Sequence, residues 1–337
     1  MISRRRIVAC APLLWASLGS RASRAAVDPS KVVRLLCGHP PGGQSDIVAR
    51  IIATRLGEIL GQSVVIENRS GAAGTIAIAL VAKAPPDGNS LLICSTGNLA
   101  LARVMVPHLP YDPVRDLAMV ARIASIPTVL AVGHWVPATN VRELIDHAKS
   151  RPGLLTGASS GVGSSSGFAL ELLKAAAGID ILQVPYGGLG PALNGLLSRQ
   201  VDMVFADLAI VAAHARNGTL RLLGTPASTR FAAAPDVATL QQQGLPDVVL
   251  DTWIGIVAPA ATPADVVASL ARAIAETIRT ADVRRRLLDG GFEPLEDTPA
   301  QFTASVKDDI RRFTAVATRL GIGTANAGGA SSTYGRP

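Results

Sequence analysis

The sequence predicts an α/β protein built from two similar Rossmann-like lobes. The first observation is a run of strand length, a glycine-rich loop and an amphipathic helix that follow one another between Val32 and Leu60. The second is the recurrence of this construction between Leu154 and Ala176. Strand-like and helix-like segments alternate around both units, which is typical of parallel sheets with helices on their faces. In such sheets, ligands bind beyond the carboxyl ends of the strands.

The first 26 residues have the layout of a secretory signal peptide. Arginines at positions 4–6 precede an apolar run over 7–18, and small residues follow up to Ala26. We therefore expect residues 1–26 to be removed and the mature protein to be soluble and periplasmic. The mature chain is close to neutral, because 25 Asp and Glu residues balance all but a few of the Lys and Arg residues outside this segment. That balance argues against nucleic-acid binding.

The first lobe is expected to open with a strand over Val32–Cys37, the loop Gly38–Gln44 and a helix that Ser45 caps. An apolar stripe at helical spacing follows, and Gly61 ends the helix. A helix N-terminus behind a glycine loop presents unpaired amide donors and a partial positive charge, so it suits an anion such as a carboxylate. The pattern continues with a strand over 63–68, a helix over 75–83, a strand over 90–94 and a loop over 95–98.

The second half repeats these patterns. We expect strands over 128–132, 154–157, 181–184, 201–205, 220–223 and 253–258, and helices over 141–149, 168–176, 191–197, 264–278 and 282–320. The strands over 128–132 and 253–258 are the expected pair that crosses between the lobes. Lobe 1 then comprises residues 27–125 and 251–321, lobe 2 comprises residues 126–250, and residues 322–337 form a disordered tail.

The serine-rich loop of the second unit allows two interpretations. Gly157–Gly161 and Gly163–Gly167 both match the G-x-S-x-G pattern, so a secreted serine hydrolase using Ser159 or Ser165 is the alternative to a binding protein. A triad also needs a downstream histidine. The histidine that follows, His214, lies in an expected helix, which is a poor place for a mobile general base. We favour the interpretation as a binding protein, in which the hydroxyls and amide donors of this loop bind an anion.

Several single residues keep two interpretations. Asp46 could contact a ligand amine or stabilise the first turn of its own helix, and Asp207 could contact a ligand or cap a loop. His39 could donate to a ligand at the mouth of a cleft or be satisfied by local backbone. Cys37 and Cys94 each end an expected strand, so we expect two buried thiols rather than a disulfide, and their spacing does not indicate a metal site.

A set of short motifs occurs along the chain in a fixed order. The set consists of Pro41–Asp46 with Ala49 and Arg50, Val65–Arg69 with Gly71 and Gly74, Pro86–Gly88, Leu109–Pro113, Ala158–Gly161, Val184–Tyr186 with Pro191–Leu193, and Trp253–Gly255 with Ala258 and Pro259. With this set, the chain resembles the Bug-type extracytoplasmic solute receptors of tripartite tricarboxylate transporters, which are TctC-like periplasmic binding proteins. The resemblance runs from about residue 30 to residue 321.

The resemblance implies a type II periplasmic binding protein fold, whose two lobes close on a small organic carboxylate and present it to a membrane permease. It implies binding without chemistry, and we expect a monomer with no cofactor and no metal. Taken with the loops above, the expected ligand-binding residues are His39, Gly42, Gly43, Ser45, Asn98, Ser159, Ser160, Gly161, Ser164 and Asp207. Asp207 would reach the far end of the ligand, which is the end opposite the carboxylate that the two loops would hold.

Three positions depart from the family pattern. His39 stands where the family usually has an aromatic residue, Gly187 where it has Lys or Arg, and Ala206-Asp207 where it often has Asp-Asn. The mouth and the far wall of the expected cleft therefore differ from those of the family, and the ligand's identity does not carry over from relatives.

Overall fold

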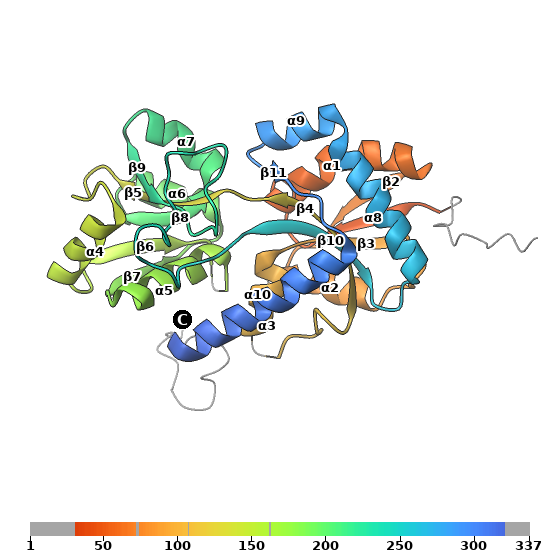
Figure 1. Ribbon diagram of the computed structural model, residues 1–337, viewed down its shortest axis with the longest axis horizontal. Coiled ribbons are helices and arrows are strands. Elements are labelled where there is room, and N and C mark those ends of the chain that lie inside the picture. Colours follow the sequence, from red (N-terminus) through yellow and green to blue (C-terminus); the bar gives the residue numbers. More distant parts are fainter. Residues whose placement is uncertain (1–30, 72–73, 107, 162, 321–337) are drawn as a thin grey trace, which may run out of the picture.

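The computed structural model describes residues 31–71, 74–106, 108–161 and 163–320. Figure 1 shows two α/β lobes side by side, joined by extended segments and by one long helix. The expected signal peptide (1–26) and the expected tail (322–337) lie outside the described residues.

Lobe 1 is built on a mixed sheet with the strand order β11-β4-β10-β3-β1-β2. Its strands are β1 (Val33–Cys37), β2 (Val64–Asn68), β3 (Ser90–Ser95), β4 (Leu117–Ser125), β10 (Trp253–Pro259) and β11 (Glu293–Pro294). Its helices include α1 (Gln44–Leu60), α2 (Thr75–Ala82), α8 (Ala264–Arg279) and α9 (Ala281–Asp289). Strands β1, β2 and β3 are parallel, so their carboxyl ends share one edge of the sheet. The apolar stripe of α1, with Val48, Ile52 and Leu56, is fully buried in the core of this lobe.

Lobe 2 is built on a sheet with the strand order β7-β6-β8-β5-β9. Its strands are β5 (Thr128–Gly133), β6 (Leu155–Ser159), β7 (Ile181–Pro185), β8 (Met203–Asp207) and β9 (Leu220–Gly224). Its helices are α4 (Val141–Ser150), α5 (Ser165–Ala177), α6 (Leu189–Leu197) and α7 (Leu208–Arg216). Strands β6, β7 and β8 are parallel, and β5 runs antiparallel to β8 and β9. Both lobes thus carry a parallel unit whose loops leave from a common edge.

The chain passes between the lobes twice, as expected. Strand β4 runs almost directly into β5, and a long segment after β9 returns to β10 (Figure 1). The two passages are bonded to each other, because the hydroxyl oxygens of Thr128 and Thr252 are 2.9 Å apart and Ile126 N donates to Thr252 O at 2.9 Å. The expected strands over 128–132 and 253–258 therefore begin just after each passage.

Helix α10 (Pro299–Leu320) contacts the cores of both lobes. Phe302 is fully buried in lobe 1 and lies edge to face with Trp253, at a centroid distance of 5.1 Å. Phe313 packs in the same manner on Phe168 of lobe 2, at 5.4 Å. The helix therefore packs against both lobes along one side of the molecule.

Replacing Trp253 with phenylalanine is expected to lower the free energy of unfolding by about 1–2 kcal/mol. The indole Nε1 donates to Asp309 Oδ2 at 2.9 Å, and Asp309 is buried, so the variant leaves a buried carboxylate with one donor fewer. Burial raises the pKa of Asp309, although the hydrogen bonds from Trp253 and Arg312 act to lower it. Urea unfolding at pH 7 measures the change. Trp135→Phe is the control, since Trp135 makes the same kind of bond to Asp202 at a half-buried site; equal losses in both variants would contradict the prediction.

Two expected features of lobe 1 are corrected by the structure. Gly43, rather than Ser45, caps α1, and Ser45 lies inside the first helical turn, where it is buried. The segment expected as a loop over 95–98 becomes helical at Gly97. It forms the π-helix η2 (Gly97–Leu101) and then α3 (Ala102–Met105), with Asn98 Oδ1 accepting from Ser95 N at 2.8 Å at the start of the turn.

Two further strands had no counterpart in the expected elements. Strand β4 occupies a segment that was not assigned, although it leads the chain into lobe 2. The helix expected over 282–320 is interrupted, because Gly291 adopts a left-handed φ of 81° after α9 and β11 then pairs with the end of β4. Cys37 and Cys94 are free and buried, which confirms the expectation of two thiols.

Candidate functional site

Loops at the carboxyl ends of β1, β2 and β3 pack closely together in lobe 1. A Cβ placed on Gly38 would lie 2.7 Å from the Cα of Gly74, so there is no room for a side chain between these two backbones. Gly74 has a φ of 92° at the start of α2, and a Cβ on it would lie 2.8 Å from Asn98 Nδ2. The residues that follow three neighbouring strands thus form one continuous face.

Asn98 leaves one polar atom of this face without a partner. The side chain is only 3% exposed, and no residue that the structure describes accepts a hydrogen bond from Nδ2. A buried donor left without an acceptor costs about 1–3 kcal/mol. This donor, which lies beside the start of α2, therefore suits an oxygen atom of a ligand.

The loop before α1 is held in place by Asp46. Gly42, with a φ of 83°, donates its N–H to Asp46 Oδ2 at 2.9 Å. Arg50 Nε and Asn68 Nδ2 donate to the same carboxylate at 2.8 and 3.0 Å. Burial alone would raise the pKa of Asp46, but these hydrogen bonds outweigh it and hold the pKa below its usual value. Asp46 therefore stabilises its own loop and helix, which is the local role that the sequence allowed.

His39 borders this loop and brings no positive charge to it. Its carbonyl oxygen accepts from Asn68 Nδ2 at 3.0 Å. Its ring Nδ1 is buried and has no hydrogen-bond partner within the described part of the chain. Burial lowers the pKa of His39, so the ring is neutral near pH 7.

The serine-rich loop of lobe 2 forms a hydrogen-bonded cap on α5. Ser164 is the N-cap residue: its Oγ accepts from Gly167 N at 3.2 Å and donates to Gly161 O at 2.7 Å. Ser160 N donates to Ser166 Oγ at 2.9 Å, which draws the end of β6 onto the first turn of the helix. The loop is therefore preformed.

Ser159 supports this loop from the sheet. It is the last residue of β6, it is fully buried, and its hydroxyl oxygen accepts from Gln183 Nε2 at 3.1 Å. The hydroxyl is therefore bonded to β7, and the expected contact of Ser159 with a ligand stays a prediction. Within the described ranges, no hydrogen bond joins Ser159 or Ser165 to a histidine, and His214 lies in the last turn of α7. The arrangement therefore lacks the nucleophile–base pair of a hydrolase.

The two sets of loops meet between the lobes. Gln44 Nε2, at the start of α1, donates to Asp207 Oδ2, at the end of β8. A Cβ placed on Gly97 of lobe 1 would lie 3.3 Å from Ser165 Oγ of lobe 2. We call this region the interlobe junction; it is formed by residues 38–46, 74 and 96–98 of lobe 1 and by residues 159–161, 163–165 and 207 of lobe 2.

Asp207 occupies the lobe 2 side of the junction without a cation beside it. It is the N-cap residue of α7, but its side chain makes no cap hydrogen bond there. No ion pair joins it to any residue that the structure describes. Burial raises the pKa of Asp207 to about 7, so the carboxyl group is only partly ionised at neutral pH.

Replacing Asp207 with asparagine is expected to stabilise the protein increasingly as the pH rises. The folded-state pKa of about 7 lies above the value of about 3.9 for an unfolded aspartate, so the wild type loses stability as the pH rises between these values. Asparagine does not titrate. The variant's advantage in unfolding free energy should grow by about 1–3 kcal/mol between pH 5 and pH 8, after allowance for partial solvent access. Urea unfolding at both pH values measures it, and an advantage that stays constant would contradict the expectation.

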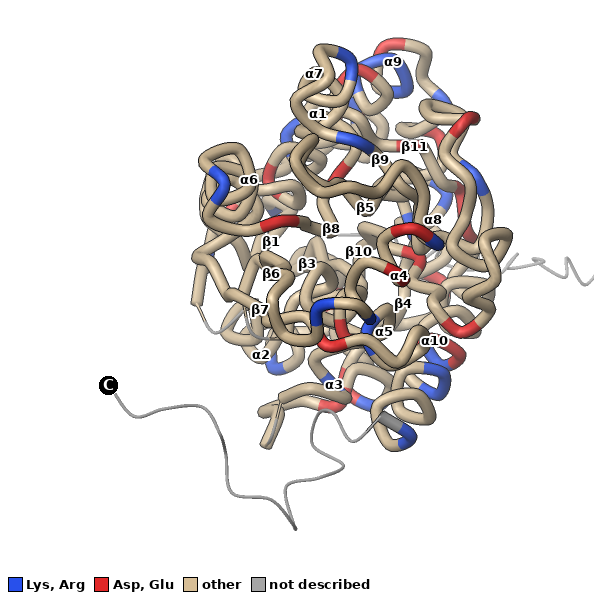
Figure 2. Tube along the Cα trace, turned by 90° about the vertical axis from the view of Figure 1, so that its left-hand side faces the viewer, with Lys and Arg blue, Asp and Glu red and all other residues tan. Residues whose placement is uncertain are grey.

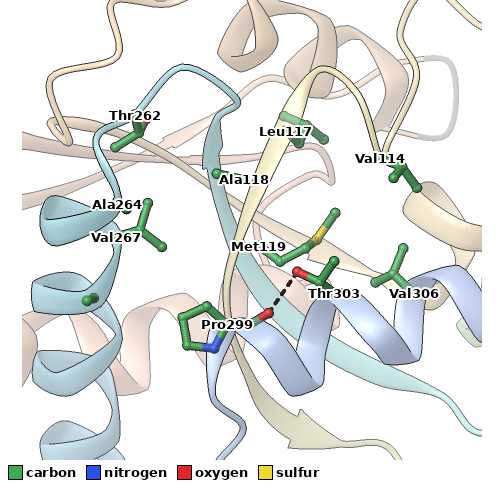
Figure 3. A pocket seen from close by; sticks show the side chains of 11 residues that line it. Val114, Leu117, Ala118, Met119, Thr262, Ala264, Val267, Pro299, Thr303 and Val306 are labelled. Atoms are coloured by element: carbon green, nitrogen blue, oxygen red, sulfur yellow. Dashed lines mark hydrogen bonds between the residues drawn. The ribbon is translucent and has the colours of Figure 1, made fainter.

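Two hollows elsewhere on the surface suit a carboxylate less well. One, of about 390 Å³, lies between β4, α8 and α10 and is lined mostly by apolar side chains such as Met119 (Figure 3). Its Thr303 hydroxyl already donates to a backbone carbonyl one turn earlier, at 2.7 Å. The other, of about 470 Å³, lies beside α10, and its Arg122 and Arg312 are paired with aspartates. Among the residues that line these two hollows, no cation is free to bind an anion.

Charged side chains are spread over the helices. Figure 2 shows Lys and Arg mixed with Asp and Glu around α9 and α10. On α9, Asp282 pairs with Arg285. Among the residues that the structure describes, none of the helices is long and apolar enough to cross a membrane, and no group of His, Cys, Asp and Glu in the same ranges could hold a metal ion.

Comparison with protein families and curated sequences gives a consistent result. The family described as tripartite tricarboxylate transporter family receptor (TctC) matches residues 48–322. The chain is 36% identical over 313 residues to the UPF0065 protein in the tcbD-tcbE intergenic region of Pseudomonas sp. strain P51, covering 93% of both chains. It is 32% identical over 294 residues to protein BugT of Bordetella pertussis, covering 87% of this chain and 90% of BugT.

Solved structures with the same fold include receptors that hold carboxylates. MatC from Rhodopseudomonas palustris, with bound malate, superposes with a TM-score of 0.76 at 32% identity and covers 86% of this chain and 99% of its own. R. palustris Rpa4515, with adipate, gives a TM-score of 0.78 at 34% identity, with coverages of 88% and 99%. The periplasmic binding protein BugD gives 0.75 at 28% identity, with coverages of 87% and 98%.

Proposed function

The chain belongs to the TctC family of tripartite tricarboxylate transporter receptors, and on this premise we propose that it captures one small organic carboxylate between its lobes for delivery to a membrane permease. The structures of relatives with malate and adipate support a carboxylate as the ligand. The signal-peptide pattern of residues 1–26 supports a periplasmic location. The family supports a membrane permease as the proposed partner, and we propose a monomer as the working unit.

The interlobe junction is the observation that carries this proposal. The first turns of α1 and α5 hold backbone amides without intrahelical acceptors, so a carboxylate can bind there without an arginine. The unpaired Asn98 Nδ2 adds a side-chain donor. We assign ligand contacts to Gly42, Gly43, Ser45 and Asn98 of lobe 1 and to Ser160, Gly161 and Ser164 of lobe 2, with His39 and Asp207 at the borders of the site and Ser159 as its support.

A thermal-shift screen of the wild type against a panel of small carboxylates tests the function. A ligand at about 100 times its Kd stabilises the folded state by about 2.7 kcal/mol, which is readily seen as a rise in Tm. We expect at least one acid to give such a shift. A panel in which no carboxylate changes the Tm would overturn the proposal.

Asn98→Asp is expected to weaken binding of that acid by at least about tenfold, or about 1.4 kcal/mol. The aspartate can still accept from Ser95 N, as Asn98 Oδ1 does at 2.8 Å, but it replaces the free donor with a negatively charged acceptor. Isothermal titration calorimetry measures the change. Asn194→Asp, on the exposed side of α6, adds the same charge outside the junction and serves as the control. Equal affinities in the two variants would show that Asn98 does not touch the ligand.

We also propose that the receptor catalyses no reaction. The buried Ser159 and the absence of a serine–histidine bond among the described residues support this. Ester hydrolysis by the wild type, Ser159→Ala and Ser165→Ala tests it directly. Turnover that depends on either serine would restore the hydrolase alternative.

Binding is proposed to close the lobes as two units, with lobe 1 comprising 27–125 and 251–321 and lobe 2 comprising 126–250. The hinge would lie at the paired passages, where Thr128 and Thr252 share a hydrogen bond. Rigid-body closure about such paired segments buries the ligand and changes the surface that a permease meets.

A further inference from the structure

One carboxylate oxygen of Asp207 has no hydrogen-bond donor among the residues that the structure describes. Gln44 from lobe 1 donates to Oδ2, whereas no residue that the structure describes donates to Oδ1. Asp207 pairs in register with Thr128 on β5 and is the N-cap residue of α7, where its side chain makes no cap hydrogen bond. Its position is thus fixed by the sheet, while one of its acceptor atoms remains available to a ligand.

No charged residue that the structure describes in lobe 1 forms an ion pair with Asp207, and burial is the only cause of its raised pKa. On α1, the Asp46 carboxylate is already bonded to Arg50, whose side chain is 56% exposed. His39 is neutral near pH 7 because burial lowers its pKa. On β11, Glu293 is a further acid, and it accepts from Ala232 N at 2.9 Å.

The elements of lobe 2 do not balance this charge either. Strand β5 carries no charged residue between Thr128 and Gly133. On α7, His214 and Arg216 stand in the last turn of the helix, at the opposite end from Asp207. A ligand that reaches Asp207 therefore meets an acid with no cation beside it.

This arrangement distinguishes between two kinds of small acid. A dicarboxylate would bring its second negative charge to Asp207, where nothing compensates for it. An acid whose far end carries an N–H or O–H group would donate to Oδ1, and an ammonium group would also neutralise the charge. We propose that the receptor prefers acids with a hydrogen-bond donor at the far end, above all an ammonium group, to dicarboxylates. This inference rests on the proposed function, because it assigns the far end of the same ligand.

Six probes in two matched sets test the preference. Succinate, 4-hydroxybutanoate and 4-aminobutanoate share one chain length, and adipate, 6-hydroxyhexanoate and 6-aminohexanoate share another. Within each set only the far end changes. Calorimetry on the full-length mature wild type at pH 8 should give a lower Kd for the amino acid than for the dicarboxylate, by at least about tenfold, in whichever set binds.

Asp207→Asn is the diagnostic variant, and its preference for the amino acid should fall at least about tenfold because the charge is gone while the shape is kept. In the wild type the same preference should also weaken from pH 8 to pH 6, since burial raises the pKa of Asp207 to about 7 and the group takes up a proton. The variant should show no such pH dependence. Asp180→Asn, at an exposed position before β7, makes the same change in net charge and should behave as the wild type.

Two results would overturn the inference in distinguishable ways. If dicarboxylates bind the wild type at least as tightly as the amino acids, and Asp207→Asn leaves the ratio unchanged, the preference is wrong while the receptor function stands. If no probe binds, and no member of the wider carboxylate panel binds either, the receptor function itself fails and the preference fails with it.

Discussion

Gly97→Leu is expected to weaken carboxylate binding by at least about 100-fold, or about 2.7 kcal/mol. Gly97 belongs to lobe 1, and a Cβ at this position would already lie 3.3 Å from Ser165 Oγ of lobe 2. The further carbons of leucine have to occupy the space where the lobes meet. In the variant the lobes are therefore held apart, and the ligand cannot contact the loops of both lobes at once. Calorimetry with the acid that gives the largest thermal shift measures the loss.

Urea unfolding of the variant is measured alongside, because Ala100 and Leu101 of η2 pack in the core of lobe 2 and report whether the substitution also disturbs folding. Ala315→Leu, on an exposed position of α10, adds the same side chain away from the junction and should bind as the wild type does. Unchanged affinity in Gly97→Leu would show that the Gly97–Ser165 contact is no part of the binding site.

Asp46→Leu is expected to lower the free energy of unfolding by about 2–4 kcal/mol. The variant leaves Gly42 N and Asn68 Nδ2 without the acceptor that they share, in a place where Asp46 itself is 1% exposed. The loop before α1 loses its anchor, so ligand affinity should fall as well. Urea unfolding at pH 7 and calorimetry measure the two effects.

Asp282→Leu is the matched control, because Asp282 also pairs with an arginine four residues later, Arg286, but on the exposed face of α9. It should cost less than about 0.5 kcal/mol. The pKa of Asp46 is held below its usual value, so its contribution is present above about pH 4 and is lost as the pH falls through the folded-state pKa. The gap between the wild type and Asp46→Leu should narrow below pH 4; a gap that persists there would contradict the assigned hydrogen bonds.

Local signals in the sequence were sufficient to locate both loops of the proposed binding site. The glycine loop before α1 and the serine-rich loop before α5 were both expected from residues close in sequence, because left-handed glycines are a local property, whereas the expected cap of α1, Ser45, is corrected to Gly43. The two lobes were inferred from the repetition of this unit. Strand β4 was missed, since a strand between two connectors carries little periodic signal of its own.

Contacts between distant segments could not be anticipated in the same way. Gln44 and Asp207 lie in different lobes, and their hydrogen bond depends on how the lobes are placed. The same holds for Phe313, which packs on Phe168 of lobe 2 although its helix starts in lobe 1. Sequence patterns indicated which groups could bind an anion, whereas the junction between them is a property of the tertiary fold.

Calorimetric titration of the wild type with its tightest-binding acid, followed by NMR of the ligand released on unfolding, tests most directly whether the junction holds an unmodified carboxylate. We expect one ligand per chain and recovery of the same compound. Heat that continues after a stoichiometric amount has been added, together with a new product in the spectrum, would contradict a binding role and point to catalysis.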